Sequence, residues 1–329
     1  MKSPLTGGET TLIEKIEEHE FRKEKFMIHV RYYVCNDTNE TFTTNEQDEL
    51  FCNELYSQYR IKHSIPFPDE IKAIREHYKL NYNQISKITG FGLNQWKQYE
   101  QGVVPSESNG KIILAIKDKN TLLAFQQASK NHFEKEEFEK IAQKIASSTN
   151  LNEKDELQQL LYSDTKRGIM NGFATMNPQK LKAMVHFLIA KEGNGICPTK
   201  LNKEMFYADF LHFKKYGVSI SGLQYKAITF GPVPYHYDTI YDNINNIIKE
   251  IVILYDTESI KLKNDTSYRP EYEIFSRQEL ETLNIVSNKL TPMKTSEIVN
   301  LSHQEEAWIK HQNNHGLIPY TEAFSLKAL

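Results

Sequence analysis

The chain has 329 residues, 39% of them apolar and 25% charged, which is enough for folded cores and excludes a chain that is disordered throughout. Lys and Arg number 40 against 43 Asp and Glu. This near balance excludes a generally basic nucleic-acid coat and a polycationic membrane binder, so any contact with DNA has to be local.

We expect a cytoplasmic protein without membrane contact. No apolar run approaches the roughly 20 residues that cross a bilayer, and the N-terminus lacks an apolar signal core. Three scattered cysteines, Cys35, Cys52 and Cys197, argue against a disulfide framework. At about 100–200 residues per domain, the length predicts two or three folded units.

Residues 1–65 are predicted to form a small β-rich module. Apolar and polar side chains alternate along Phe26–Val34 as they do in a half-buried strand. From Pro68 the apolar residues fall at helical spacing instead, and glycine and proline separate the short helical units. These helices are expected at about 83–89, 93–101 and 108–116. Residues 66–117 should therefore fold as a compact helical bundle.

The remaining sequence predicts a helical connector at residues 118–164 and a larger α+β domain at residues 165–329. In the latter, Asn177 begins one helix, a second helix is expected at about 200–213, and Ser276 opens a third through a capping box. Strands are expected at about 225–230, 251–255 and 272–275. The predicted fold class is multidomain and mainly α with small β parts, the C-terminal domain being mostly helical.

The segment 83–102 reads Asn-Gln-Ile-Ser-Lys-Ile-Thr-Gly-Phe-Gly-Leu-Asn-Gln-Trp-Lys-Gln-Tyr-Glu-Gln-Gly. It resembles the helix-turn-helix of the Cro/repressor (XRE) family, which ends in aromatic-Glu-x-Gly. Trp96 and Tyr99 are expected to anchor the second helix, which leaves polar side chains outward for base edges and phosphate. The candidate DNA contacts are Gln84, Lys87, Asn94, Gln95, Lys97 and Gln98. The alternative is a helical module whose polar residues serve only solubility.

The N-terminal module shares part of a zinc-binding pattern. Residues 1–6 and 33–38 resemble the zinc module of MqsA-like antitoxins, in which two Cys-x-x-Cys pairs precede the same type of helix-turn-helix. The four matching positions hold Ser3, Thr6, Cys35 and Thr38. A structural zinc site needs four Cys or His ligands and only one is present, so the resemblance implies the topology without the metal. Cys35 is expected to be a packed cysteine rather than a reactive one.

Four segments of the C-terminal domain, taken in order, resemble the Panacea (SocA-like) domain. They are Leu-Asn-Lys-Glu-Met-Phe-Tyr-Ala-Asp-Phe at 201–210, Tyr-Gly-Val-Ser-Ile-Ser-Gly-Leu-Gln-Tyr-Lys-Ala at 216–227, Phe-Gly-Pro-Val-Pro at 230–234 and Leu-Ser-His-Gln-Glu-Glu-Ala-Trp at 301–308. With a helix-turn-helix upstream, the resemblance implies a bacterial or phage antitoxin that binds and blocks a partner toxin. It also implies a homodimer that represses its own operon at a palindromic operator.

Aromatic side chains, which favour interface hot spots, are dense between residues 201 and 234. Phe206 and Phe210 lie four apart on one helix and are expected to face inward. The candidate toxin contacts are Tyr207, Asp209, His212, Lys215, Tyr235 and His236.

We expect no catalytic residues, no cofactor and no metal. The sequence has no phosphate-binding loop, nucleophile elbow or paired-acid motif, and His311 and His315 have metal-pair spacing without a His-Glu-x-x-His motif. Two other functions stay open: a transcriptional regulator that senses a small ligand, and a proteolytic adaptor. A neighbouring small open reading frame that is toxic when expressed alone would favour the antitoxin.

Overall fold

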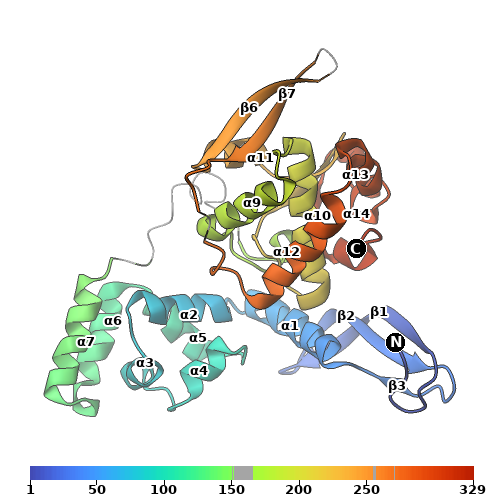
Figure 1. Ribbon diagram of the computed structural model, residues 1–329. Coiled ribbons are helices and arrows are strands. Elements are labelled where there is room, and N and C mark those ends of the chain that lie inside the picture. Colours follow the sequence, from blue (N-terminus) through green and yellow to red (C-terminus); the bar gives the residue numbers. More distant parts are fainter. Residues whose placement is uncertain (150, 152–165, 255–256, 270) are drawn as a thin grey trace. The chain divides into compact units, whose positions relative to one another are not determined.

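The computed structural model describes residues 1–149, 151, 166–254, 257–269 and 271–329, which fall into two units (Figure 1). The first unit comprises Met1–Thr43 and Phe51–Lys154, and the second comprises Thr44–Leu50 and Asp155–Leu329. Helices outweigh small antiparallel sheets, which confirms the predicted fold class. Domain boundaries after residues 65, 117 and 164 stay predictions. In the described part of the chain, no helix is both long and apolar enough to cross a bilayer.

A long hairpin begins the first unit. Strands β1 (Thr10–Phe21) and β2 (Glu24–Cys35) pair over their whole length, and β3 (Thr41–Phe42) adds to β2. Arg22 and Lys23 form the two-residue turn with positive φ, which matches the twist of the strands. One face of the hairpin buries Phe26 and Ile28 in a cluster with Leu55 and Tyr59 of α1 (Asn45–Lys62). The strand predicted at 26–34 is confirmed.

Short helices build the rest of the first unit: α2 (Pro68–His77), α3 (Tyr82–Thr89), α4 (Gln95–Glu100), α5 (Glu107–Ala115), α6 (Lys119–Ala128) and α7 (Lys135–Ser147). The helices predicted at 83–89, 93–101 and 108–116 are confirmed, with ends shifted by about two residues at most. Gly90 ends α3 with a φ of 72°, a conformation that glycine adopts without strain. Leu122 of α6 and Ile141 of α7 share one core with α2 to α5.

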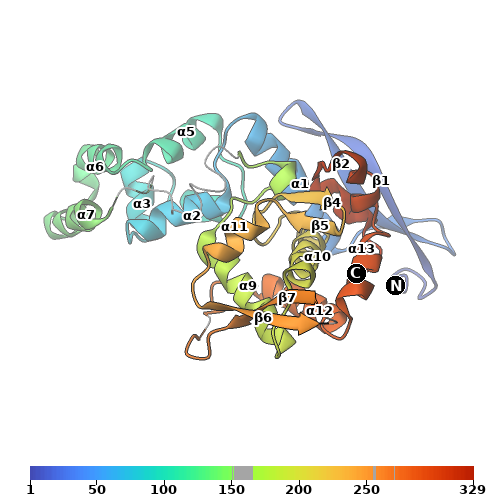
Figure 2. The same ribbon diagram turned by 90° about the horizontal axis from the view of Figure 1, so that it is seen from above.

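Helix α10 (Pro198–Tyr216) lies in the middle of the second unit (Figure 2). It contacts α9 (Pro178–Glu192), α12 (Arg277–Leu290), α13 (Thr295–Ser302) and the C-terminal 3-10 helix Tyr320–Ser325. Because neighbours surround it, every residue from 200 to 213 is buried, charged residues included. The helices expected from Asn177, at 200–213 and from Ser276 are confirmed, and the caps predicted at Asn177 and Ser276 are present.

Two small sheets complete the second unit. Strand β4 (Tyr225–Ile228) pairs with β5 (Gly231–Pro234) and β8 (Leu317–Ile318), and β6 (Ile247–Leu254) pairs with β7 (Thr257–Asn264) as a hairpin that stands out from the helices (Figure 1). In sequence, the short helix α11 (Tyr237–Asp242) lies between β5 and β6, and the short helix α14 (Glu306–Ile309) lies between β7 and β8. The strand predicted at 272–275 is wrong, because the Phe275 N–H bonds back to the Tyr272 carbonyl and closes a turn before α12.

Candidate DNA-binding and partner-binding sites

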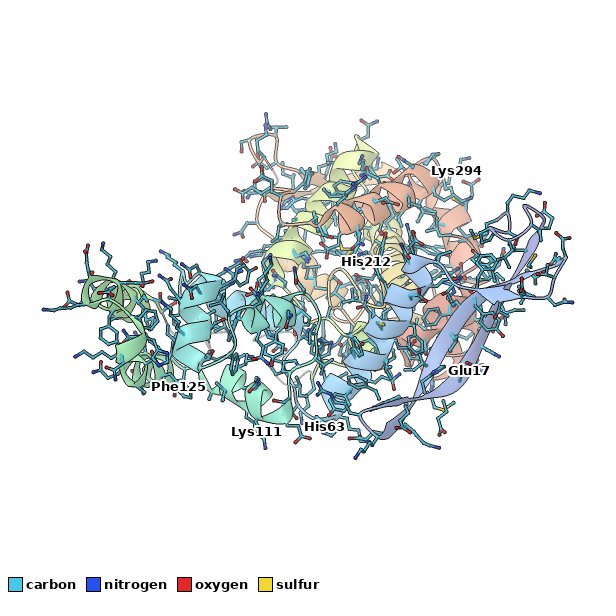
Figure 3. The ribbon with its side chains drawn as sticks, turned by 90° about the horizontal axis from the view of Figure 1, so that it is seen from below. Glu17, His63, Lys111, Phe125, His212 and Lys294 are labelled. Atoms are coloured by element: carbon cyan, nitrogen blue, oxygen red, sulfur yellow. The ribbon has the colours of Figure 1, made fainter. Side chains whose placement is uncertain are left out.

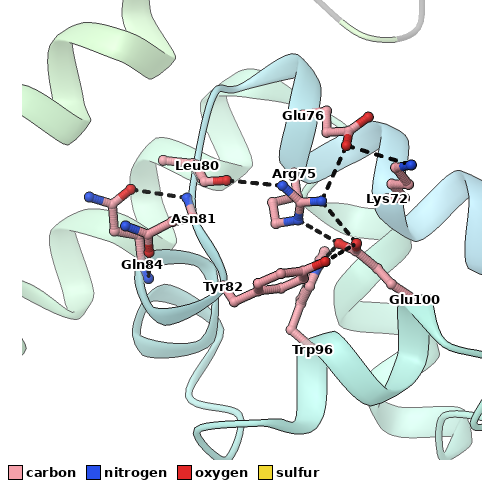
Figure 4. Close-up of polar contacts among 9 residues, drawn as sticks. All are labelled: Lys72, Arg75, Glu76, Leu80, Asn81, Tyr82, Gln84, Trp96 and Glu100. Atoms are coloured by element: carbon pink, nitrogen blue, oxygen red, sulfur yellow. Dashed lines mark hydrogen bonds and ion pairs between the residues drawn. The ribbon is translucent and has the colours of Figure 1, made fainter. Parts of the chain in front are cut away.

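Glu100 holds α4 against its neighbouring helices (Figure 4). Its carboxylate accepts the indole N–H of Trp96 at 2.8 Å and two N–H groups of Arg75 at 2.6 and 2.9 Å. The hydroxyl of Tyr82 in α3 also donates to it, at 3.1 Å. The side chains of Arg75 and Glu100 are 12% and 5% exposed, so a largely buried ion pair links α2 to α4, and the Tyr82 hydroxyl joins α3 to them. From the sequence, Glu100 was recognised only as the glutamate of the aromatic-Glu-x-Gly pattern, and its ion pair with Arg75 was not predicted.

Helix α4 presents most of the candidate DNA contacts to solvent. Trp96 and Tyr99 are buried as predicted, whereas Asn94, Lys97 and Gln98 are exposed. Gln95 is half-buried, and its side-chain oxygen accepts the Gly92 N–H at 3.2 Å. An outward amide is the group that pairs with adenine, and an outward ammonium is the group that meets guanine or phosphate.

Gln84 and Lys87 of α3 contact residues at the start of α7 and just before it. Gln84 is buried, and its amide donates to the carboxylate of Glu137 at 3.2 Å. The ammonium of Lys87, which is half-buried, lies 5.0 Å from the ring centre of Phe133. Three glutamates, Glu134, Glu136 and Glu137, line the groove beside Gln84. We therefore leave Gln84 out of the proposed DNA contacts.

The four positions of the degenerate zinc pattern come together around the sulfur of Cys35. This side chain is fully buried, and the hydroxyl of Thr6 lies 3.5 Å from the sulfur. Hydrogen bonds from Ser3, Thr38 and Thr6 lower the pKa of the Cys35 thiol from 9.0 to about 6. Among the described residues, no group of three or more His, Cys, Asp or Glu is placed to hold a metal ion.

Asp209, a candidate toxin contact, lies in the core of the second unit. Its carboxylate accepts the backbone N–H groups of Ile220 at 2.9 Å and Ser221 at 2.8 Å, and the hydroxyl of Tyr225 at 2.7 Å. The hydroxyl of Ser221 donates to it as well. Burial raises the pKa of Asp209, and these hydrogen bonds oppose that rise. The side chain fixes the loop that leads into β4, and it does not reach the surface.

Two further candidates on α10, Tyr207 and His212, are also buried. Figure 3 labels His212 among the side chains of the second unit. The hydroxyl of Tyr207 donates to Glu305 at 3.2 Å, and Nδ1 of His212 lies 2.7 Å from the Val218 carbonyl oxygen. Burial lowers the pKa of His212 to about 4. We therefore leave Tyr207, Asp209 and His212 out of the proposed interface.

The other three candidates reach the surface. Lys215, at the end of α10, is one-third exposed and pairs with Glu281 at 3.2 Å. His236 is exposed, and its ring lies 3.8 Å from that of the half-buried Tyr235. The ammonium of Lys226 in β4 lies 4.5 Å from the ring centre of Tyr235. The structure thus brings Tyr235, His236 and Lys226 together beside the sheet.

Sequence reasoning also missed a buried lysine on α10. Lys203 is fully buried, and its ammonium has no hydrogen-bond partner among the residues that the structure describes. Burial lowers the pKa of Lys203 from 10.5 to about 7. One position on, burial and the neighbouring Glu192 raise the pKa of Glu204 to about 9. Adjacent charged residues on a helix normally indicate a solvated face, so the sequence carried no signal for this burial.

Residues 201–309 match the family described as Antitoxin SocA-like, Panacea domain. The match runs from α10 to α14 and includes Lys203, the β4–β5 turn and the β6–β7 hairpin. It lies within the expected Panacea-like domain at 165–329. No curated protein and no solved structure matches the chain. The likeness of residues 1–65 to an MqsA-like module and of residues 83–102 to a repressor helix-turn-helix stay predictions.

Proposed function

We propose that this chain is a cytoplasmic antitoxin that binds and blocks a partner toxin through its second unit. The observation that carries the proposal is the match of residues 201–309 to the antitoxin SocA-like Panacea domain. Neutralisation proceeds by protein–protein contact, without catalysis, cofactor or metal. Three of the toxin-binding residues predicted from the sequence remain in the proposal. They are Lys215, Tyr235 and His236, which all reach the surface.

The second part of the proposal is repression of the chain's own operon through α3 and α4. Asn94, Gln95 and Gln98 read base edges in the major groove, and Lys87 and Lys97 contact phosphate. The buried pair of Arg75 and Glu100 supports this role, because it fixes the angle at which α4 meets the groove. A homodimer presents two such helices to half-sites about 34–36 Å apart.

Co-expression with the product of the adjacent gene tests both parts. The neighbour alone should arrest growth, and the wild-type chain should restore growth and shift its own promoter DNA at low salt. Asn94→Ala is the matched control, since it should release the promoter and still restore growth. A harmless neighbour, or growth restored only when a host protease is present, would contradict direct neutralisation and favour the regulator or the adaptor.

A further inference from the structure

The turn between β4 and β5 carries the exposed aromatic side chain of Phe230 on a rigid support. Phe230 is 63% exposed, although it lies within the segment that is otherwise packed around α10. The indole N–H of Trp308 donates to the Ile228 carbonyl at 2.8 Å, and His303 hydrogen-bonds to the backbone of Thr229. A large apolar side chain on a fixed backbone loses little entropy on binding, as interface hot spots do.

Gly231 shows how closely this turn approaches the core. Its φ is 97°, and a Cβ atom there would overlap the hydroxyl oxygen of Ser302 and lie 2.6 Å from Cε of Lys203. A Cβ atom there would displace the side chains of Ser302 and Lys203, and the positive φ itself favours glycine. The ammonium nitrogen of Lys203 would lie 3.2 Å from a Cβ atom on Gly231, so the buried amine lies directly against the turn.

Two buried nitrogen atoms lie beside the turn. Within the described residues, neither Nζ of Lys203 nor Nε2 of His303 has a hydrogen-bond partner, and both atoms are buried. The His303 ring stacks on Trp308 at 3.9 Å. Burial, and after it the charge of Lys203, lower the pKa of His303. A buried amine without a hydrogen-bond partner destabilises a fold, and such groups are concentrated at functional sites.

We propose that Phe230, His303 and Trp308, here called the Phe230 surface, dock an acidic segment of the partner toxin. This inference rests on the proposed function and deepens it. An apolar side chain of the toxin packs against Phe230 and Trp308, and a neighbouring carboxylate lies over His303. That carboxylate compensates the charge of Lys203, whose field is weakly screened beneath the surface.

Charge complementarity favours an acidic partner over a second copy of this chain. A two-fold interface brings the same patch of both copies together, so the Lys203 amine of one copy would meet its own equivalent rather than a carboxylate. Another exposed apolar surface of the second unit is formed by Ile251, Ile253 and Ile260 on the β6–β7 hairpin, and it has no unpaired buried cation beneath it among the described residues. It provides the matched control.

The test compares the dissociation constant of the adjacent gene's product for four full-length chains: wild type, Phe230→Ala, Lys203→Met and Ile253→Ala. Phe230→Ala and Lys203→Met should each weaken binding at least about tenfold, and Ile253→Ala should change it less than about twofold. Thermal melting and promoter binding check that each variant is folded.

The outcomes separate the docking surface from the function. Wild-type affinity in Phe230→Ala and Lys203→Met overturns the Phe230 surface and leaves the antitoxin standing, and a loss confined to Ile253→Ala moves the toxin to the hairpin. Conversion of a dimer to a monomer by Phe230→Ala, measured by light scattering, makes the surface an interface between copies and overturns the proposal. A wild-type chain that binds no toxin overturns the proposed function itself.

Discussion

Replacing Lys203 by methionine should stabilise the protein, which is unusual for a substitution at a fully buried position. Methionine keeps most of the volume of the lysine side chain and removes the amine, for which no described residue provides a partner. The wild-type chain has to bury or neutralise an ammonium each time it folds. The variant has no such cost.

The size of the effect follows from the pKa of Lys203, which burial lowers from 10.5 to about 7. Each pKa unit is worth about 1.36 kcal/mol, so at pH 7 the amine costs about 4 kcal/mol of folding free energy. Between pH 7 and pH 10.5 the unfolded chain binds more protons than the folded chain, and wild-type stability therefore rises with pH. The gain from Lys203→Met should be largest at or below pH 7 and should vanish toward pH 10.5.

Urea unfolding of wild type, Lys203→Met and Lys289→Met at pH 7 and at pH 10 measures this gain. Lys289 is exposed on α12, so its replacement should leave the free energy of unfolding nearly unchanged. We expect Lys203→Met to gain about 2–4 kcal/mol at pH 7 and much less at pH 10. Equal gains at both pH values, or a loss at pH 7, would refute the view that an unpaired amine is buried here.

Three other results are expected. Glu100→Ala should lower the free energy of unfolding by about 3–5 kcal/mol in urea because it strands a buried guanidinium, and a loss below about 1 kcal/mol would show the ion pair to be solvated. Asn94→Ala should cost about 1–3 kcal/mol at the operator and relax specificity, whereas Lys97→Ala should weaken binding to all sequences alike; equal effects in a gel-shift series would contradict the assignment. Purified protein should contain no stoichiometric zinc, and chelator should leave its melting temperature unchanged, because hydroxyl groups surround Cys35; one zinc per chain by elemental analysis would contradict this.

Local signals in the sequence predicted the helices well. Asn177 and Ser276 begin their helices through side-chain caps, and Gly90 ends α3, because each device acts within one turn of the chain. The β1 strand and the β7 strand were not anticipated, since their charged, alternating sequences also suit exposed helix or loop. Pairing with β2 and β6 decides their structure, and such pairing is not visible locally.

The sites were less predictable because burial depends on distant segments. On α10 the sequence placed Phe206 and Phe210 inward correctly, but it placed Asp209 outward. Nothing near Asp209 in sequence shows that Ser221 and Tyr225 supply its hydrogen bonds. Helix α10 has no polar face to predict, since neighbours cover it all round. Gln84 was misjudged for the same reason, because its partner lies on α7.

The central claim is that the toxin binds the second unit at the segment that matches the Panacea domain. Hydrogen exchange of the full chain, with and without the adjacent gene's product, tests it most directly. We predict that the toxin slows exchange within residues 201–309, most strongly at the turn that carries Phe230, and leaves residues 66–117 unchanged. Protection confined to residues 1–149 would contradict the claim and place neutralisation in the first unit.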